Sequence, residues 1–166
     1  MLLAACGNEP IQLHNELSWS SASLQRSPSC QFSLAAVTDR TQSSDKIGAI
    51  GNAPVLASDV VGWVRAAFEQ IPGHSQQPQN LSLDVELVRS YIHALSVSKS
   101  ANVVIRVNYL RPAQNPITRA YRGADTSMNW FSSDSEVQSA FNRALKEMAQ
   151  QVAGDLGQFC ESANSR

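Results

Sequence analysis

The sequence has little charge, few aromatic residues and no long apolar run. Charged residues make up 16% and aromatic residues 7% of the 166 residues, whereas 43% are hydrophobic. This balance excludes a disordered chain and is poor in charge for a cytoplasmic protein. No run of 18 apolar residues is present, which excludes a membrane-spanning helix. Thirteen Lys and Arg against fourteen Asp and Glu give none of the basic excess that is usual in nucleic-acid binders.

Residue patterns for catalysis or metal binding are also scarce. His14, His74 and His93 are scattered and lack the spacing of metal ligands, and no G-x-S-x-G motif is present. Asp84 and Glu86 share one side of an alternating strand, and a pair of carboxylates can catalyse glycoside hydrolysis. They lie on the polar side of that strand, however, where carboxylates are usually just exposed to solvent. The sequence therefore predicts no enzyme, no cofactor and no metal, with an envelope enzyme acting on glycans as the weakest alternative.

One of the three cysteines lies in a motif of its own. Cys6 follows Leu3-Ala4-Ala5, a hydrophobic residue and two small residues, which is the pattern cut by bacterial lipoprotein signal peptidase. We expect the Cys6 thiol to carry a diacylglycerol, and residues 1–5 to be the remnant of a signal peptide that begins further upstream. The alternative interpretation is a chance L-A-A-C sequence.

Two cysteines remain if Cys6 is acylated. Cys30 and Cys160 stand at the two ends of the predicted domain, and an even remainder in an oxidising compartment favours a disulfide. In the chain-entropy model, closing so long a loop stabilises by at most roughly 4–5 kcal/mol. Two unpaired thiols are the alternative, and the absence of a C-x-x-C motif argues against redox catalysis.

Residues 6–29 are rich in Ser, Asn, Gln and Pro, and their apolar residues show no sustained period. Such a segment buries too little surface to offset its ordering entropy, so it predicts a flexible linker behind the lipidated cysteine. Leu17-Ser18-Trp19 could still dock on the domain or on a partner. A single globular domain is then expected over residues 30–160, followed by a tail at 161–166.

Hydrophobic periodicity predicts the elements of that domain. Period-2 alternation predicts strands, and apolar stripes behind Ser58 and the capping box at Ser133 predict two helices, the second ending at Gly157. The predicted strands cover residues 32–37, 81–87, 103–109 and 117–129, with loops at 41–57 and 73–79 and a bulge near 88–90. The order βαβββα with short turns predicts an α+β two-layer sandwich, in which a mainly antiparallel four-stranded sheet is covered by two helices on one face.

The last hairpin of this sheet predicts a polar surface. If residue 106 pairs with 121 and residue 108 with 119, one face carries Arg106, Asn108, Arg119 and Tyr121. Two arginines and an aromatic ring could bind an anionic headgroup, a glycan or a partner protein. An ordinary solvated sheet face is the alternative.

Several short segments resemble one family. The Leu3–Cys6 motif, Asp39-Arg40 after the first strand, Tyr121-Arg122-Gly123, the strand at 81–87 and the helix from Ser133 are similar to YajG-type lipoproteins of Gram-negative bacteria. The element order also resembles the auxiliary lipoprotein domain of certain ABC transport systems. The resemblance spans about residues 30–156. It implies a periplasm-facing, membrane-anchored domain without catalysis.

The leading hypothesis for function is a lipid-anchored, non-catalytic binding or adaptor domain of the cell envelope. Its partners would be the membrane, through Cys6, and an envelope protein. The alternative is an accessory subunit of an ABC-type lipid or solute trafficking system, with transporter subunits as partners. Gly7 after the cysteine resembles lipoproteins exported to the outer membrane, with the inner membrane as the alternative.

Overall fold

The computed structural model describes residues 9–24, 31–41, 45–95, 97–128 and 133–164, with side chains described up to residue 160. Its larger sheet has five strands in the order β5-β2-β6-β7-β8. These strands are β2 (Phe32–Asp39), β5 (His74–Ser75), β6 (Ser82–Ala94), β7 (Lys99–Leu110) and β8 (Ile117–Ser127). Strands β6, β7 and β8 are antiparallel neighbours, whereas β2 runs parallel to β5 and β6.

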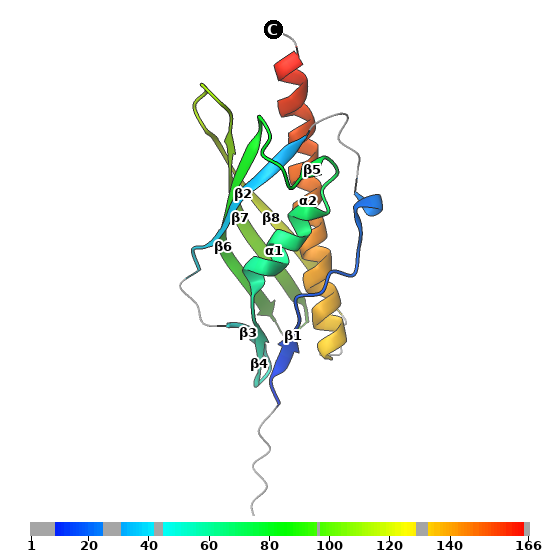
Figure 1. Cartoon of the computed structure of the whole chain (residues 1–166). Coiled ribbons are helices and arrows are strands. Elements are labelled where there is room, and N and C mark those ends of the chain that lie inside the picture. The colour runs from blue at the N-terminus through cyan, green and yellow to red at the C-terminus, as the bar shows by residue number, and fades with distance from the viewer. Residues whose placement is uncertain (1–8, 25–30, 42–44, 96, 129–132, 165–166) are drawn as a thin grey trace, which may run out of the picture.

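A smaller sheet of three strands lies at one end of the molecule (Figure 1). Its order is β1-β4-β3, with β1 (Ile11–Leu13), β3 (Lys46–Ile50) and β4 (Ala53–Ala57). The hairpin β3–β4 occupies the segment for which a loop was predicted, and β1 pairs with β4 in parallel. The loop prediction for residues 41–57 is therefore wrong for 46–57, because Gly51 at φ 59° supplies the tight turn that joins two short apolar strands.

Two α-helices lie on the same face of the five-stranded sheet (Figure 1). They are α1 (Val60–Glu69) and α2 (Asp134–Asn164), and a 3₁₀ turn, η1, covers Ser21–Ser23. The predicted α+β class with two helices is confirmed, but the predicted mainly antiparallel four-stranded sheet is wrong, because the sheet has five strands and two of its pairings are parallel. The chain reaches β6 from β2 through the β3–β4 hairpin and α1, and such a crossover places two neighbouring strands in parallel.

Both helices begin close to their predicted positions. The cap of α1 is Asp59 instead of Ser58, and its carboxylate accepts a hydrogen bond from the Gly62 backbone N–H (2.8 Å). At α2, the Ser133 hydroxyl accepts the backbone N–H of Glu136 (3.4 Å), as the capping box predicts. The predicted end of α2 at Gly157 is wrong, since the helix continues to residue 164.

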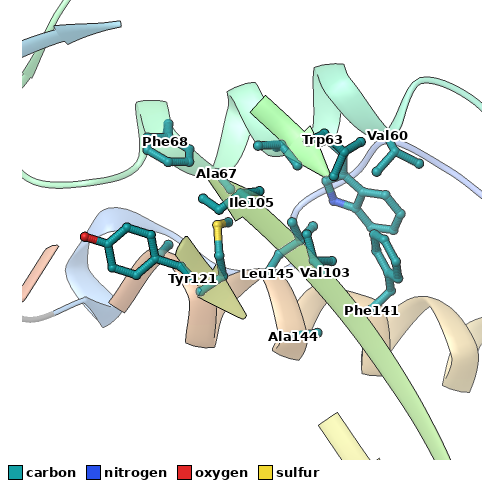
Figure 2. Close-up of a cluster of buried hydrophobic side chains, with 14 of the residues drawn as sticks. Val60, Trp63, Ala67, Phe68, Val103, Ile105, Tyr121, Phe141, Ala144 and Leu145 are labelled. Atoms are coloured by element: carbon teal, nitrogen blue, oxygen red, sulfur yellow. The ribbon is translucent and has the colours of Figure 1, made fainter. Parts of the chain in front are cut away.

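The main core lies between the two helices and the inner face of the sheet. Trp63 of α1 stacks against Phe141 of α2, with ring centroids 4.6 Å apart, and both side chains are fully buried (Figure 2). Val103 and Ile105 of β7 close the cluster from the sheet side. At roughly 1.5–3 kcal/mol for each buried large apolar side chain, this cluster holds both helices to one sheet face.

Gly123 sets how closely α2 approaches β8. A Cβ atom at this position would lie 1.8 Å from the carbonyl oxygen of Ala144 and 2.9 Å from the Cβ of Met148. Only a residue without a side chain fits there, because a helix backbone is on the other side.

Residues 9–24 belong to the folded domain, so the linker prediction is wrong for this part of residues 6–29. Ile11, Leu13 and Leu24 are buried in the core. The Asn142 side chain of α2, which is 2% exposed, donates to the Glu16 carbonyl (3.0 Å) and accepts the Ser18 N–H (3.4 Å). Its backbone carbonyl accepts the indole N–H of Trp19, at 3.1 Å. Composition missed this docking because the segment's few apolar residues are buried by α1, α2 and β4, which lie far away in the sequence.

Gly123→Ala is expected to destabilise the protein by about 3 kcal/mol, because the new methyl group can only be accommodated by moving α2 away from β8. Chemical denaturation measures this free energy of unfolding. The matched control is Gly154→Ala in α2, where a Cβ atom meets nothing within 4 Å. This control is expected to be neutral or stabilising by up to about 1 kcal/mol. Equal effects of the two substitutions would contradict the close helix–sheet contact.

Candidate functional site

The hairpin β7–β8 has a register one residue away from the predicted one. Arg106 pairs with Ala120, Asn108 pairs with Thr118, and Ile105 pairs with Tyr121. A shift of one residue moves every side chain of a strand to the opposite face. The prediction that Arg106 and Asn108 share a face with Arg119 and Tyr121 is therefore wrong.

Arg106 and Asn108 lie on the outer face, the side of the sheet opposite the helices. Three further arginines accompany Arg106 there, one after β2 and one each on β6 and β8. We call the four together the arginine face: Arg40, Arg89, Arg106 and Arg122. The outward positions of β6, β7 and β8 carry only two carboxylates, Asp84 and Glu86.

One carboxylate serves two arginines of this face. Glu86 Oε2 lies 3.0 Å from Arg106 Nη1, and Glu86 Oε1 lies 3.4 Å from Arg40 Nη2. The two guanidinium side chains keep 52% and 65% of their surface exposed, whereas Glu86 keeps 16%. The arrangement therefore holds two arginines in place while presenting a net positive charge to the solvent.

The other two arginines are oriented by neutral neighbours. Arg122 donates from Nη2 (2.6 Å) and Nε (3.2 Å) to the side-chain oxygen of the buried Asn102. The Arg89 guanidinium carbon stands 4.7 Å from the ring centroid of Tyr91, a cation–π geometry. Among the described residues, no carboxylate lies within ion-pair distance of Arg89 or Arg122. Their remaining N–H groups face solvent in the fork geometry that suits carboxylate or phosphate.

Three arginines of this face were not predicted: Arg40 follows β2, Arg122 depends on the β7–β8 register, and Arg89 depends on a bulge in β6. The register between β6 and β7 shifts between Leu87 and Arg89, so Arg89 joins Glu86 on the outer face although the two are an odd number of residues apart. The bulge was predicted near 88–90 and is confirmed. Such a bulge turns Arg89 to the outer face, and this was the sequence signal from which Arg89 could have been assigned to the arginine face.

Arg119 and Tyr121 meet α2 on the helix side of the sheet. Arg119 Nη1 and the Tyr121 hydroxyl both contact Asp155 Oδ2, at 2.8 Å and 2.7 Å, and the Tyr121 hydroxyl also bonds the Tyr109 hydroxyl. The hydroxyl of Tyr121 points away from the apolar cluster (Figure 2). Phe159 stacks on Tyr109, with centroids 4.3 Å apart, which explains why α2 continues beyond Gly157.

Burial is the main cause that raises the pKa of Tyr109 and of Tyr121 above the ordinary phenol value, and hydrogen bonding to Asp155 raises the pKa of Tyr121 further. Both phenols therefore stay protonated in the folded protein and act as hydrogen-bond donors. This cluster fastens the C-terminal half of α2 to the sheet.

A cavity of about 170 Å³ lies between the end of β2, the β3–β4 hairpin and the start of α1. Two of its three carboxylates serve local structure: Asp59 accepts from Gly62 and from Asn15, and Asp39 accepts the Thr41 N–H (2.7 Å). Among the described residues, no group of three His, Cys, Asp or Glu side chains is placed to hold a metal. None of the described helices is long and apolar enough to cross a membrane.

The three cysteines fall mostly outside the described residues. Cys6 and Cys30 lie outside the described residues, so the lipidation of Cys6 and the pairing of Cys30 with Cys160 remain predictions. Cys160, near the end of α2, is disulfide-bonded and packs against the core.

A scan against protein-family models finds no match, and neither does a search of curated proteins. Among solved structures, the chain is similar to the protein XCC0632 from Xanthomonas campestris, of family DUF330. The TM-score is 0.61 at 16% sequence identity, over 93% of this chain and 97% of that chain. A minor lipoprotein from Acinetobacter baumannii matches with a TM-score of 0.47 at 8% identity, over 78% of this chain and 94% of that chain. The first likeness shows that the fold is shared.

Alkaline pH is expected to destabilise the protein through Tyr109 and Tyr121. The unfolded phenols lose a proton near pH 10, whereas the folded ones stay protonated, so the free energy of unfolding falls as pH rises above about 10. Each such tyrosine contributes at most about 1.4 kcal/mol per pH unit there.

Denaturation between pH 8 and pH 11 measures this slope. The double variant Tyr109→Phe/Tyr121→Phe is expected to lose most of it, while Tyr91→Phe on the outer face keeps it. Identical slopes for both variants would contradict the role of the buried pair.

Proposed function

We propose that this chain is a lipid-anchored, non-catalytic adaptor of a bacterial cell envelope, which binds the acidic surface of an envelope protein through its arginine face. The single observation that carries the proposal is the outer face of the sheet, which neither described helix covers and where four arginines accompany only two carboxylates. Anchoring rests on Cys6 and its Leu3-Ala4-Ala5 motif.

Geometry supports binding by this face. The adjacent strands β6, β7 and β8 each carry one of these arginines, and Arg89 and Arg122 pair with Val104 from its two sides, so their positions are fixed by the sheet rather than by a loop. Arg106 is held by Glu86 and Arg122 by Asn102, which lowers the entropy lost when a partner binds. Arginine is also enriched among the residues that dominate protein–protein binding energies.

The similarity to XCC0632 supports the fold on which the proposal is based, and it does not bear on the binding partner. The outer membrane is the proposed location, with the domain facing the periplasm, on the basis of Gly7 after the cysteine.

Affinity purification from detergent-solubilised envelopes tests the proposal. We expect an acylated Cys6 in the N-terminal peptide and an envelope protein that co-purifies in stoichiometric amount. The double variant Arg106→Ala/Arg122→Ala is expected to lower its recovery tenfold or more, because each truncated arginine costs about 1 kcal/mol or more of binding energy.

The matched control removes two positive charges from the helix layer, Arg65→Ala/Lys146→Ala, and is expected to leave recovery unchanged. Equal loss in both variants, or no stoichiometric partner of the acylated protein, would contradict the binding role. ABC-transporter subunits among arginine-dependent partners would support the narrower role of an accessory subunit.

A further inference from the structure

Exposed apolar side chains gather at one end of the molecule. Among the described residues, four large apolar side chains are well exposed, and three of them are Leu95 (56%), Val97 (70%) and Met128 (77%). Leu95 and Val97 lie in the β6–β7 turn. Met128 follows Ser127, which pairs with Lys99 directly after that turn. We call these three residues the apolar tip. The fourth, Ile117 (46%), begins β8 at the opposite end of the sheet.

The N-terminal segment enters the domain at the end that carries the apolar tip. Ile11 pairs with Val55, and Val55 pairs with Gly48. Gly48 lies against Ile92, since a Cβ atom there would be 2.6 Å from the Ile92 carbonyl oxygen. From this level β6 runs toward Leu95, which directly follows its last residue. The β3–β4 turn, the start of β1 and the end of β6 point toward the same end (Figure 1).

Few residues separate Cys6 from the start of β1. Ile11 is the first strand residue, five positions after Cys6. A fully extended chain of five residues spans at most about 18 Å. A lipid on Cys6 would therefore keep β1, and with it this end of the domain, within that distance of the bilayer surface.

We propose that the apolar tip inserts into the surface of the bilayer that holds the Cys6 anchor, so that the domain stands on its β6–β7 turn and is not free to rotate on a tether. This inference rests on the proposed acylation of Cys6. A bilayer is the occupant because the anchor brings one within reach of these side chains, and apolar side chains at loop tips gain free energy on entering the acyl boundary.

In the proposed orientation the two ends of the sheet lie in different environments. Leu95, Val97 and Met128 would meet lipid, whereas Ile117 would point away from it. The arginine face would then run along the side of the domain and remain accessible to a partner.

Fluorescence quenching by brominated lipids tests this orientation. The acylated full chain is reconstituted into phosphatidylethanolamine and phosphatidylglycerol vesicles with brominated acyl chains. Val97→Trp places a probe in the apolar tip, and Ile117→Trp places the matched control at the opposite end. The quenching of the unsubstituted protein is subtracted as the background of its native tryptophans. We expect the Val97→Trp probe to be quenched at least twofold more than the Ile117→Trp probe.

Mass spectrometry of the N-terminal peptide distinguishes a failure of the membrane insertion from a failure of the lipid anchor. An acylated protein whose two probes are quenched equally would overturn the insertion while leaving the anchor in place. A protein without an acyl group on Cys6 would overturn the anchor and, with it, this inference.

Discussion

The register of the β7–β8 hairpin is the constraint on which the rest of the structure depends. Pairing Ile105 with Tyr121 directs Tyr121 and Arg119 toward α2, where Asp155 receives both, and leaves Arg106 facing solvent. The same register turns Gly123 toward α2, so that the helix backbone can approach the strand. A slip of one residue would place a bulky side chain where α2 now lies and would bury Arg106 or Arg122 against apolar neighbours, at a cost of several kcal/mol.

Helix α2 then organises the N-terminal part of the chain. Its Asn142 and Gln138 side chains bind the backbone of residues 14–18, and Asn142 is nearly fully buried in doing so. Because residues 9–24 are part of the domain, a lipid on Cys6 would hold the domain close to the bilayer surface. The sheet therefore has one face covered by helices, one face rich in arginine, and one end close to where the chain enters.

Much of the fold follows from local patterns. The alternation over 81–87 and 103–109, the cap at Ser133 and the bulge near Arg89 are properties of neighbouring residues, and the structure confirms them. The register of β7–β8 could not be predicted, because the polar turn allows two pairings that differ by one residue and only contact with α2 selects one. The parallel pairing of β2 and the docking of residues 9–24 also depend on contacts between distant segments. Of the predicted binding residues, Arg106 and Asn108 stay on the outer face, while Arg119 and Tyr121 fasten α2.

Cross-strand nuclear Overhauser contacts in the labelled protein measure this register most directly. The account predicts backbone contacts that join residue 105 to residue 121 and residue 106 to residue 120. Contacts that join residue 106 to residue 121 and residue 108 to residue 119 would contradict it. They would return Arg119 and Tyr121 to the outer face and turn Arg122 toward α2, so that the arginine face would lose Arg122 and the contacts of Asp155 with Arg119 and Tyr121 would be lost.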